Sequence, residues 1–374
     1  MGIRLFFAGD VVLSSQQQTS LMSKELMEKI QGCDIACCNF EAPISFPNQI
    51  ASAKIGPSIS QNVNAVKQLA SDGFNLFCLA NNHIMDYGEA GLKNTIDLLD
   101  GFGVTHIGAG FDGEEVYAPY ILEKENIRIG ILSVAENGFG SYTQNVDAGY
   151  AWYGADLFNN KLGALVAECD FVIVVCHGGA EKWNYPLPEY RSLYKSWIDR
   201  GAGAVIAHHP HVPQGWEEYN NGFIFYSLGN FAFDKGLGIQ DPETISVILE
   251  IEKTGAKYEI VKSEFTSEGV VINRRQTFDE HLQECNAILH SDRYLEEVNK
   301  KSIEQFERRY RGYYLAVSNI YSGSLKKVLK TLLLRYIRRE HFSETWLYHN
   351  IEIETHYWIC RRALMLRREK VNTR

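Results

Sequence analysis

The chain has 374 residues, of which 45% are hydrophobic and 22% are charged, and its formal net charge is −9. This composition is typical of a soluble globular protein, and the length predicts about two domains of roughly 150 residues each. The negative charge argues against a nucleic-acid binder, because such proteins present basic surfaces to phosphates. The charge is uneven, since residues 325–374 hold 12 Lys and Arg against 5 Asp and Glu, which leaves −16 on residues 1–324.

Short apolar runs alternate with segments of helical spacing along the first 235 residues. We expect buried strands at 3–10, 34–41, 75–83, 105–110, 127–136, 171–179, 204–211 and 222–230. Helices are expected at "SKELMEKIQG", "NVNAVKQLASDG", "EAGLKNTIDLLDGFG" and "PEYRSLYKSWIDRG", each of which ends at Gly. The alternation predicts βαβ units and a largely parallel sheet. Residues 244–272 alternate apolar and polar side chains, which predicts a closing antiparallel hairpin.

The pattern becomes helical from about residue 275. We therefore expect a first domain at 1–272 and a helical extension with a basic tail at 273–374. The segment "SLKKVLKTLLLRYIRR" (324–339) has two interpretations. Its Leu and Val face could pack on the main domain, or it could be an amphipathic basic helix that binds an anionic membrane surface or a partner.

The eight cysteines form no C-x-x-C pair, and most of them lie in apolar runs. This pattern indicates buried reduced thiols rather than disulfides or a zinc site. The run at the start of "MGIRLFFAGD" is too short for a signal peptide, and no stretch reaches the ~18 apolar residues of a membrane span. We expect a cytoplasmic protein that could lie at the inner face of the membrane through its basic tail.

Polar side chains follow five of the predicted strands where each strand ends. They are Asp10, Glu41, Asn82, His83, His177, His209 and His211. Each alone could be a structural residue, since Asn and Asp are common turn formers. Together they should meet at the carboxyl edge of a parallel sheet, where burying so many polar groups is costly without a ligand. Imidazole, carboxylate and amide donors suit a divalent metal ion.

The H-x-H pair depends on the backbone between its members. In an extended segment, residues two apart point to the same side, so His209 and His211 should face one site. The same alternation predicts that His208 points away.

Six motifs occur in the order found in CapA-type capsule-synthesis proteins. They are "GD" (9–10), "NFEAPI" (39–44), "ANNHIMDYGEAGL" (80–92), "HGGAE" (177–181), "HPHVPQG" (209–215) and "YSLGNFAFD" (226–234). Over about residues 3–235 the chain thus resembles this family, which lies within the calcineurin-like metallophosphoesterase superfamily. The resemblance implies an α/β fold, the calcineurin-like α/β/β/α sandwich with mixed, largely parallel sheets; the C-terminal helical extension lies outside it.

The resemblance also implies roles for single residues. The metal ligands would be Asp10, Glu41 as the bridging acid, Asn82, His177, His209 and His211. They would hold one or two divalent ions, and Mn, Fe, Zn and Mg all tolerate such donors. The superfamily opening Asp-x-His is absent here, because Asp10 is followed by "VVLS". The number of metal ions therefore stays open.

The same resemblance makes His83 the general acid. Asp86 would orient the His83 ring, as a carboxylate does in other hydrolytic sites. Alternatively, Asp86 forms a turn that caps the helix expected near Glu89.

Three further residues are candidates for substrate binding or for support of the ligands. They are Glu181, Asn230 and Asn39. The alternative for Asn230 is a purely structural turn with Gly229. Gly178 and Lys182 stand where the family typically has Trp and Tyr, which predicts an altered substrate pocket.

The function implied is metal-dependent hydrolysis of phosphoester or phosphodiester bonds in the synthesis of a capsule or cell-surface polymer, either poly-γ-glutamate or a polysaccharide. A metal-activated water would be the nucleophile. One alternative is an amide- or polymer-processing enzyme that acts on poly-γ-glutamate. The other is a non-catalytic accessory subunit of a membrane polymer synthase. The expected partners are a phosphorylated or polymeric anion and, through the basic helix, a membrane or a synthase.

Overall fold

The computed structural model describes residues 2–14, 21–54, 56–143, 147–234, 241–311 and 352–372. The chain forms two compact units. The first comprises Met1–Ser52 and Ser58–His290, and the second comprises Ala53–Pro57 and Ser291–Arg374. The basic segment predicted at 324–339 lies outside the described residues.

The first unit contains a sheet of eight strands in the order β16-β15-β14-β1-β2-β3-β4, with β13 also paired to β1. Its strands are β1 (Ile3–Val12), β2 (Ile35–Phe40), β3 (Leu76–Cys78), β4 (Thr105–Ile107), β13 (Asn230–Phe233), β14 (Glu243–Glu252), β15 (Gly255–Thr266) and β16 (Gly269–Ile272). β1 pairs in parallel with β2 and β13, and β2, β3 and β4 continue in parallel. β14, β15 and β16 are antiparallel, which confirms the predicted closing hairpin.

A second sheet of six strands has the order β11-β12-β10-β9-β7-β6. Its strands are β6 (Tyr120–Lys124), β7 (Ile127–Ala135), β9 (Phe171–His177), β10 (Ala204–His208), β11 (Trp216–Tyr219) and β12 (Gly222–Phe225). The four central strands are parallel, and β6 and β11 are antiparallel edges. The run 105–110, predicted as one strand, is divided between β4 and β5 (Ala109–Gly110), and β5 pairs with β8 (Gly149–Tyr150). Gly108 makes the break, because its φ is +95°.

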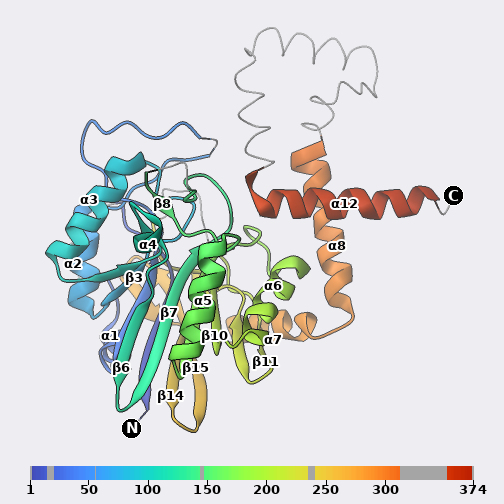
Figure 1. Ribbon diagram of the computed structural model, residues 1–374. Coiled ribbons are helices and arrows are strands. Elements are labelled where there is room, and N and C mark those ends of the chain that lie inside the picture. Colours follow the sequence, from blue (N-terminus) through green and yellow to red (C-terminus); the bar gives the residue numbers. More distant parts are fainter. Residues whose placement is uncertain are drawn as a thin grey trace. The chain divides into compact units, whose positions relative to one another are not determined.

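The two large sheets face each other across one apolar core. Leu5 and Phe7 of β1 belong to the same buried cluster as Ile129 of β7 and Ile206 of β10. Helices cover the outer faces, with α2 and α3 on the side of the first sheet and α5 and α6 on the second (Figure 1). The helices are α1 (Lys24–Gln31), α2 (Val63–Asp72), α3 (Gly88–Gly101), α4 (Gly113–Val116), α5 (Asp156–Glu168), α6 (Pro188–Asp199) and α7 (Gln276–Leu289). This arrangement confirms the predicted α/β/β/α sandwich with mixed sheets.

The helix α7 belongs to the first unit, although the sequence placed it in the extension. Its Phe278 and Leu282 are buried in the core between the sheets. The first compact unit therefore ends at His290 rather than at residue 272. The apolar face of α7 explains the difference, because a sequence does not show which surface such a face covers.

The described part of the second unit is helical. It contains α8 (Arg293–Gln305), the π-helical turn η2 (Phe306–Tyr310) and α12 (Glu354–Asn372). α12 packs against α8, and Arg362 Nη1 donates to Asn299 Oδ1 at 3.2 Å. Among the described residues, no helix combines the length and the apolar character needed to cross a membrane.

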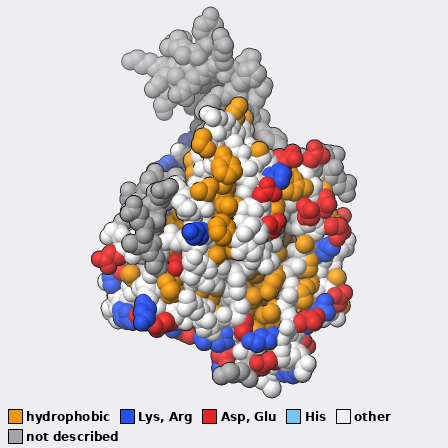
Figure 2. Space-filling model, turned by 90° about the vertical axis from the view of Figure 1, so that its left-hand side faces the viewer, with side chains coloured by type: hydrophobic (Ala, Val, Ile, Leu, Met, Phe, Trp, Pro, Cys, Tyr) orange, Lys and Arg blue, Asp and Glu red, His pale blue; other side chains and the backbone are white. Residues whose placement is uncertain are grey.

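One face of the molecule is shown in Figure 2. Hydrophobic side chains form a band on this face, and acidic and basic side chains are intermixed beside it. Over the described part of the face shown, neither sign of charge forms a uniform area.

Candidate metal centre

The site lies at the carboxyl ends of parallel strands from both sheets. Asp10 of β1 is the register partner of Asn230 of β13, and the Asp10 amide donates to the Gly229 carbonyl at 3.0 Å. A Cβ on Gly9 would lie 2.0 Å from that carbonyl oxygen, so this close approach of two strands requires glycine. The β1–β13 pairing thus brings Asp10 and Asn230 to the same edge.

Two buried carboxylates form one side of the site. Glu41 follows β2, and neither of its oxygens has a hydrogen-bond partner among the described residues. Burial and the neighbouring Asp10 raise the pKa of Glu41 well above its ordinary value. Burial also opposes ionisation of Asp10, but a hydrogen bond from His211 and the nearby imidazoles outweigh it and lower the pKa of Asp10.

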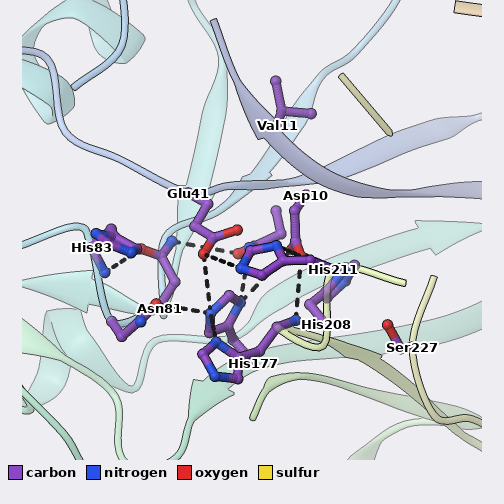
Figure 3. Close-up of polar contacts among 12 residues, drawn as sticks. Asp10, Val11, Glu41, Asn81, His83, His177, His208, His211 and Ser227 are labelled. Carbon is purple, nitrogen blue, oxygen red and sulfur yellow. Dashed lines mark hydrogen bonds and ion pairs between the residues drawn. The ribbon is translucent and has the colours of Figure 1, made fainter. Parts of the chain in front are cut away.

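Histidines from the second sheet point toward these carboxylates (Figure 3). His177 ends β9, and its Nε2 lies 3.5 Å from Glu41 Oε1 and 3.0 Å from both Asn82 Oδ1 and His209 Nδ1. Burial and the His209 ring lower the pKa of His177 well below its ordinary value. Burial also lowers the pKa of His209 to about 4. Both rings are therefore neutral near pH 7, which is the form that binds metal ions.

His211 contacts both carboxylates. Its Nδ1 lies 2.9 Å from Asn230 Oδ1 and 3.4 Å from Asp10 Oδ2, and its Nε2 lies 3.7 Å from Glu41 Oε1. Burial opposes protonation of this ring, but Glu41 and Asp10 outweigh it and raise the pKa of His211 to about 10. His211 is therefore protonated near neutral pH and offsets the negative charge of Asp10.

The backbone prediction for the H-x-H pair was wrong. His209 and His211 adopt φ values of +94° and +60°, so the segment is not extended. Such left-handed conformations cost free energy in residues other than Gly and are concentrated at functional sites. Because the alternation is broken, His208 does not point away, and its Nδ1 lies 3.5 Å from Asp10 Oδ1.

These side chains form two groups that could each hold a metal ion. One contains Glu41, His177 and His209, and the other contains Asp10, Glu41 and His211. In each group the donor atoms lie within 4.8 Å of one another, and Glu41 is common to both. The unpartnered oxygens of buried Glu41 and the mixed oxygen and nitrogen donors fit divalent cations.

His83 and Asp86 form a close pair beside this site. His83 Nδ1 lies 2.7 Å from Asp86 Oδ2, which also accepts from the Ile59 amide at 2.8 Å. The alternative role of Asp86 as a helix cap is not observed, because α3 follows Tyr87 without a side-chain capping bond. Asp86 therefore holds the His83 ring in a fixed orientation.

The remaining predicted residues surround the donors. Asn39 Nδ2 lies 2.7 Å from Asp10 Oδ1 and 3.0 Å from His177 Nδ1, so Asn39 orients both. Glu181 is exposed, and its charge raises the pKa of both His209 and His211, although burial has the larger effect on each.

Glu136 is a site residue that the sequence analysis missed. It is buried directly after β7, and its Oε1 lies 3.6 Å from His209 Nε2. The pattern that identified the other residues also applies to Glu136, because it is a polar residue at the end of the apolar run 127–136.

Comparison with known proteins identifies the family. Residues 4–235 match the family model described as bacterial capsule synthesis protein PGA_cap. The chain is 30% identical to the capsule biosynthesis protein CapA of Bacillus anthracis over 225 residues, covering 58% of this chain and 55% of that protein. It is also 30% identical to the PGA biosynthesis protein CapA of Bacillus subtilis (strain 168) over 241 residues, covering 62% and 63%. The matched region thus spans little more than half of these curated relatives.

A solved structure of a novel phosphatase from Mycoplasma pneumoniae is similar at a TM-score of 0.44 and 14% identity, covering 70% of this chain and 93% of that one. The family match includes β1, β2, β9 and β10, whose ends carry Asp10, Glu41 and the three imidazoles. The chain belongs to the bacterial capsule synthesis protein PGA_cap family.

Proposed function

We propose that this protein is a metal-dependent hydrolase of phosphoester or phosphodiester bonds that serves the synthesis of a capsule or cell-surface polymer. The observation that carries the proposal is Glu41, a buried carboxylate without a hydrogen bond among the described residues that is shared by two groups of donors. Leaving such a group uncompensated is costly, and a cation between the two groups would compensate it.

The two groups of donor residues would each bind one ion. Asp10, Glu41 and His211 would hold one divalent ion, and His177 and His209 would join Glu41 at a second, with Asn82 beside His177. Bound ions would supply positive charge that stabilises the phosphoryl oxygens and acidifies water.

Proton transfer to the leaving group would fall to His83. Asp86 occupies its Nδ1 side, so that Nε2 is the ring atom for donation to the leaving oxygen. Because Asp86 is buried and also accepts from the Ile59 amide, the ring would not need to reorient during the reaction.

The biological setting is supported by the names of the relatives. Two of them are a capsule and a PGA biosynthesis protein, so the substrate would be a phosphorylated or polymeric anion from that process. A membrane or synthase partner would bind through the basic tail, most of which lies outside the described residues.

A second candidate is an accessory role without catalysis. It is favoured by a relative of Mycobacterium tuberculosis that is 26% identical over 219 residues and is named a probable polyglutamine synthesis accessory protein. Processing of an amide linkage in poly-γ-glutamate at the same metal centre is the remaining alternative.

The test is elemental analysis of the purified protein together with hydrolysis of bis-p-nitrophenyl phosphate after addition of Mn²⁺. We expect bound metal and turnover. Bound metal without turnover would favour the hypothesis that the protein processes an amide linkage in poly-γ-glutamate. Absence of metal after reconstitution would favour the accessory role.

A further inference from the structure

Glu136 is a buried carboxylate for which the proposed reaction gives no role. Its side chain lies at the end of β7, and its Oε1 is 3.6 Å from His209 Nε2, a little beyond hydrogen-bond distance. Its amide donates to the His177 carbonyl at 2.9 Å, so its backbone is bound to the residue that ends β9. Burying a carboxylate is costly, so its place beside a candidate ligand calls for a functional reason.

Tyr190 of α6 fixes the other oxygen of this carboxylate. The Tyr190 hydroxyl donates to Glu136 Oε2, and burial with the nearby Glu136 charge raises the pKa of the phenol well above its ordinary value. Tyr190 is therefore a hydrogen-bond donor at neutral pH. Because Oε2 is held by this bond, Oε1 is the oxygen directed toward His209.

The backbone after His177 leaves room for this pair. Gly178 follows directly, and a Cβ there would lie 3.1 Å from Tyr190 Cε1 and 3.3 Å from Glu136 Cβ. A side chain at residue 178 would thus press on both partners. The glycine, the glutamate and the tyrosine form one packed arrangement behind His177 and His209.

The orientation of the His209 ring connects this arrangement to the metal centre. His209 Nδ1 lies 3.0 Å from His177 Nε2, so Nδ1 faces the donor group that includes Glu41, while Nε2 faces Glu136. A neutral imidazole can bind a cation through Nδ1 only if Nε2 carries the proton. A carboxylate beside Nε2 favours that tautomer.

We propose that Glu136, held by Tyr190, is a positioning residue that keeps His209 in the tautomer and orientation needed to bind a divalent cation through Nδ1. This inference rests on the metal centre of the proposed function. In this role Glu136 would act through His209 and not as a ligand of the ion.

The test is calorimetric titration of the full-length, metal-free protein with Mn²⁺. Glu136→Gln should weaken Mn²⁺ binding about 10- to 100-fold, the usual effect of losing a carboxylate behind a ligand histidine. Tyr190→Phe removes only the hydroxyl that holds the carboxylate and should weaken binding in the same direction, but less. If Glu136→Gln no longer unfolds cooperatively on heating, it is misfolded, and the Mn²⁺ affinity of Tyr190→Phe then tests the inference.

Glu217→Gln is the matched control. Glu217 is also a buried carboxylate that accepts from a tyrosine hydroxyl, Tyr226, but it lies among Arg191 and Lys195 rather than at the metal centre. It should leave Mn²⁺ affinity unchanged. Wild-type Mn²⁺ affinity in both Glu136→Gln and Tyr190→Phe would overturn the inference about Glu136 but not the proposed function. An equal loss of Mn²⁺ affinity in Glu217→Gln would have the same consequence. A wild-type protein that binds no Mn²⁺ would overturn the proposed function as well.

Discussion

At the scale of single residues, the site is defined by how its charges are compensated. His211, whose pKa is raised to about 10, lies close to both Asp10 and Glu41. Glu41 nevertheless keeps two oxygens without hydrogen bonds among the described residues. A divalent cation bound by those oxygens would displace the proton of His211. Metal binding would therefore be coupled to proton release.

The proposed role of His83 can be separated from that of the candidate metal ligands. His83→Ala should lower kcat for bis-p-nitrophenyl phosphate about 10²- to 10⁴-fold, the usual contribution of a general acid, while metal content stays at the wild-type value. His106→Ala is the control, because His106 pairs with Asp100 away from the donor groups. Loss of metal together with turnover would make His83 a ligand instead.

At the scale of elements, the close approach of β1 and β13 positions Asp10. Gly9→Ala would place a Cβ 2.0 Å from the Gly229 carbonyl oxygen, and it should lower the free energy of unfolding by about 1–3 kcal/mol or more. Gly163→Ala is the matched control, since a Cβ on this exposed residue of α5 would meet nothing within 4 Å apart from its chain neighbours and the helix's own backbone. It should raise the free energy of unfolding by about 0.5–1 kcal/mol. Urea titration measures both, and equal shifts would contradict this account of the strand pair.

A charged cluster joins α6 to β11. Burial opposes ionisation of Glu217, but hydrogen bonds from Arg191 and Tyr226 outweigh it and lower the pKa of Glu217 to about 2 from an ordinary 4.5. A lowered pKa means that this carboxylate stabilises the fold above pH 4.5 and loses that effect as the pH falls toward 2. The difference in unfolding free energy between wild type and Glu217→Gln should therefore be largest near pH 7 and shrink below pH 4.5. A difference in unfolding free energy that did not change with pH would contradict this role of ionised Glu217. Glu218→Gln, at the neighbouring exposed position, controls for the loss of one negative charge.

Strand ends were the part of the site that the sequence could predict. Apolar runs locate the ends of β1, β2, β9 and β10, because buried parallel strands are nearly continuous in hydrophobic residues. The left-handed backbone of His209 and His211 could not be predicted, since only tertiary packing compensates its cost. Glu136 was missed although it is the polar residue at the end of the predicted strand 127–136, the same feature that located Asp10 and Glu41.

At the scale of the whole molecule, the open question was how the predicted strands are divided among separate sheets. Hydrophobic periodicity predicts strands but not their order, so the division of 105–110 between two sheets was not predictable. The division of charge, in contrast, is read directly from the sequence, with +7 on residues 325–374 and −16 on the remainder.

That charge division predicts the effect of removing the tail. A protein truncated after residue 324 should keep wild-type kcat/KM on bis-p-nitrophenyl phosphate, because the donor groups lie within Met1–Ser52 and Ser58–His290. It should sediment less with vesicles that contain anionic lipid, since each Lys or Arg near such a surface contributes about 1 kcal/mol. Lost activity would assign the tail to the catalytic core, and unchanged sedimentation would exclude it as the membrane contact.

The measurement that tests the central claim most directly is the metal content of wild type and Glu41→Gln after reconstitution with Mn²⁺. Glu41 is the carboxylate common to both donor groups, so its loss should weaken both together. We expect bound metal in the wild-type protein and a large drop in Glu41→Gln, with Glu217→Gln unchanged. Equal metal content in wild type and Glu41→Gln would contradict the assignment of this cluster as a metal centre built around Glu41.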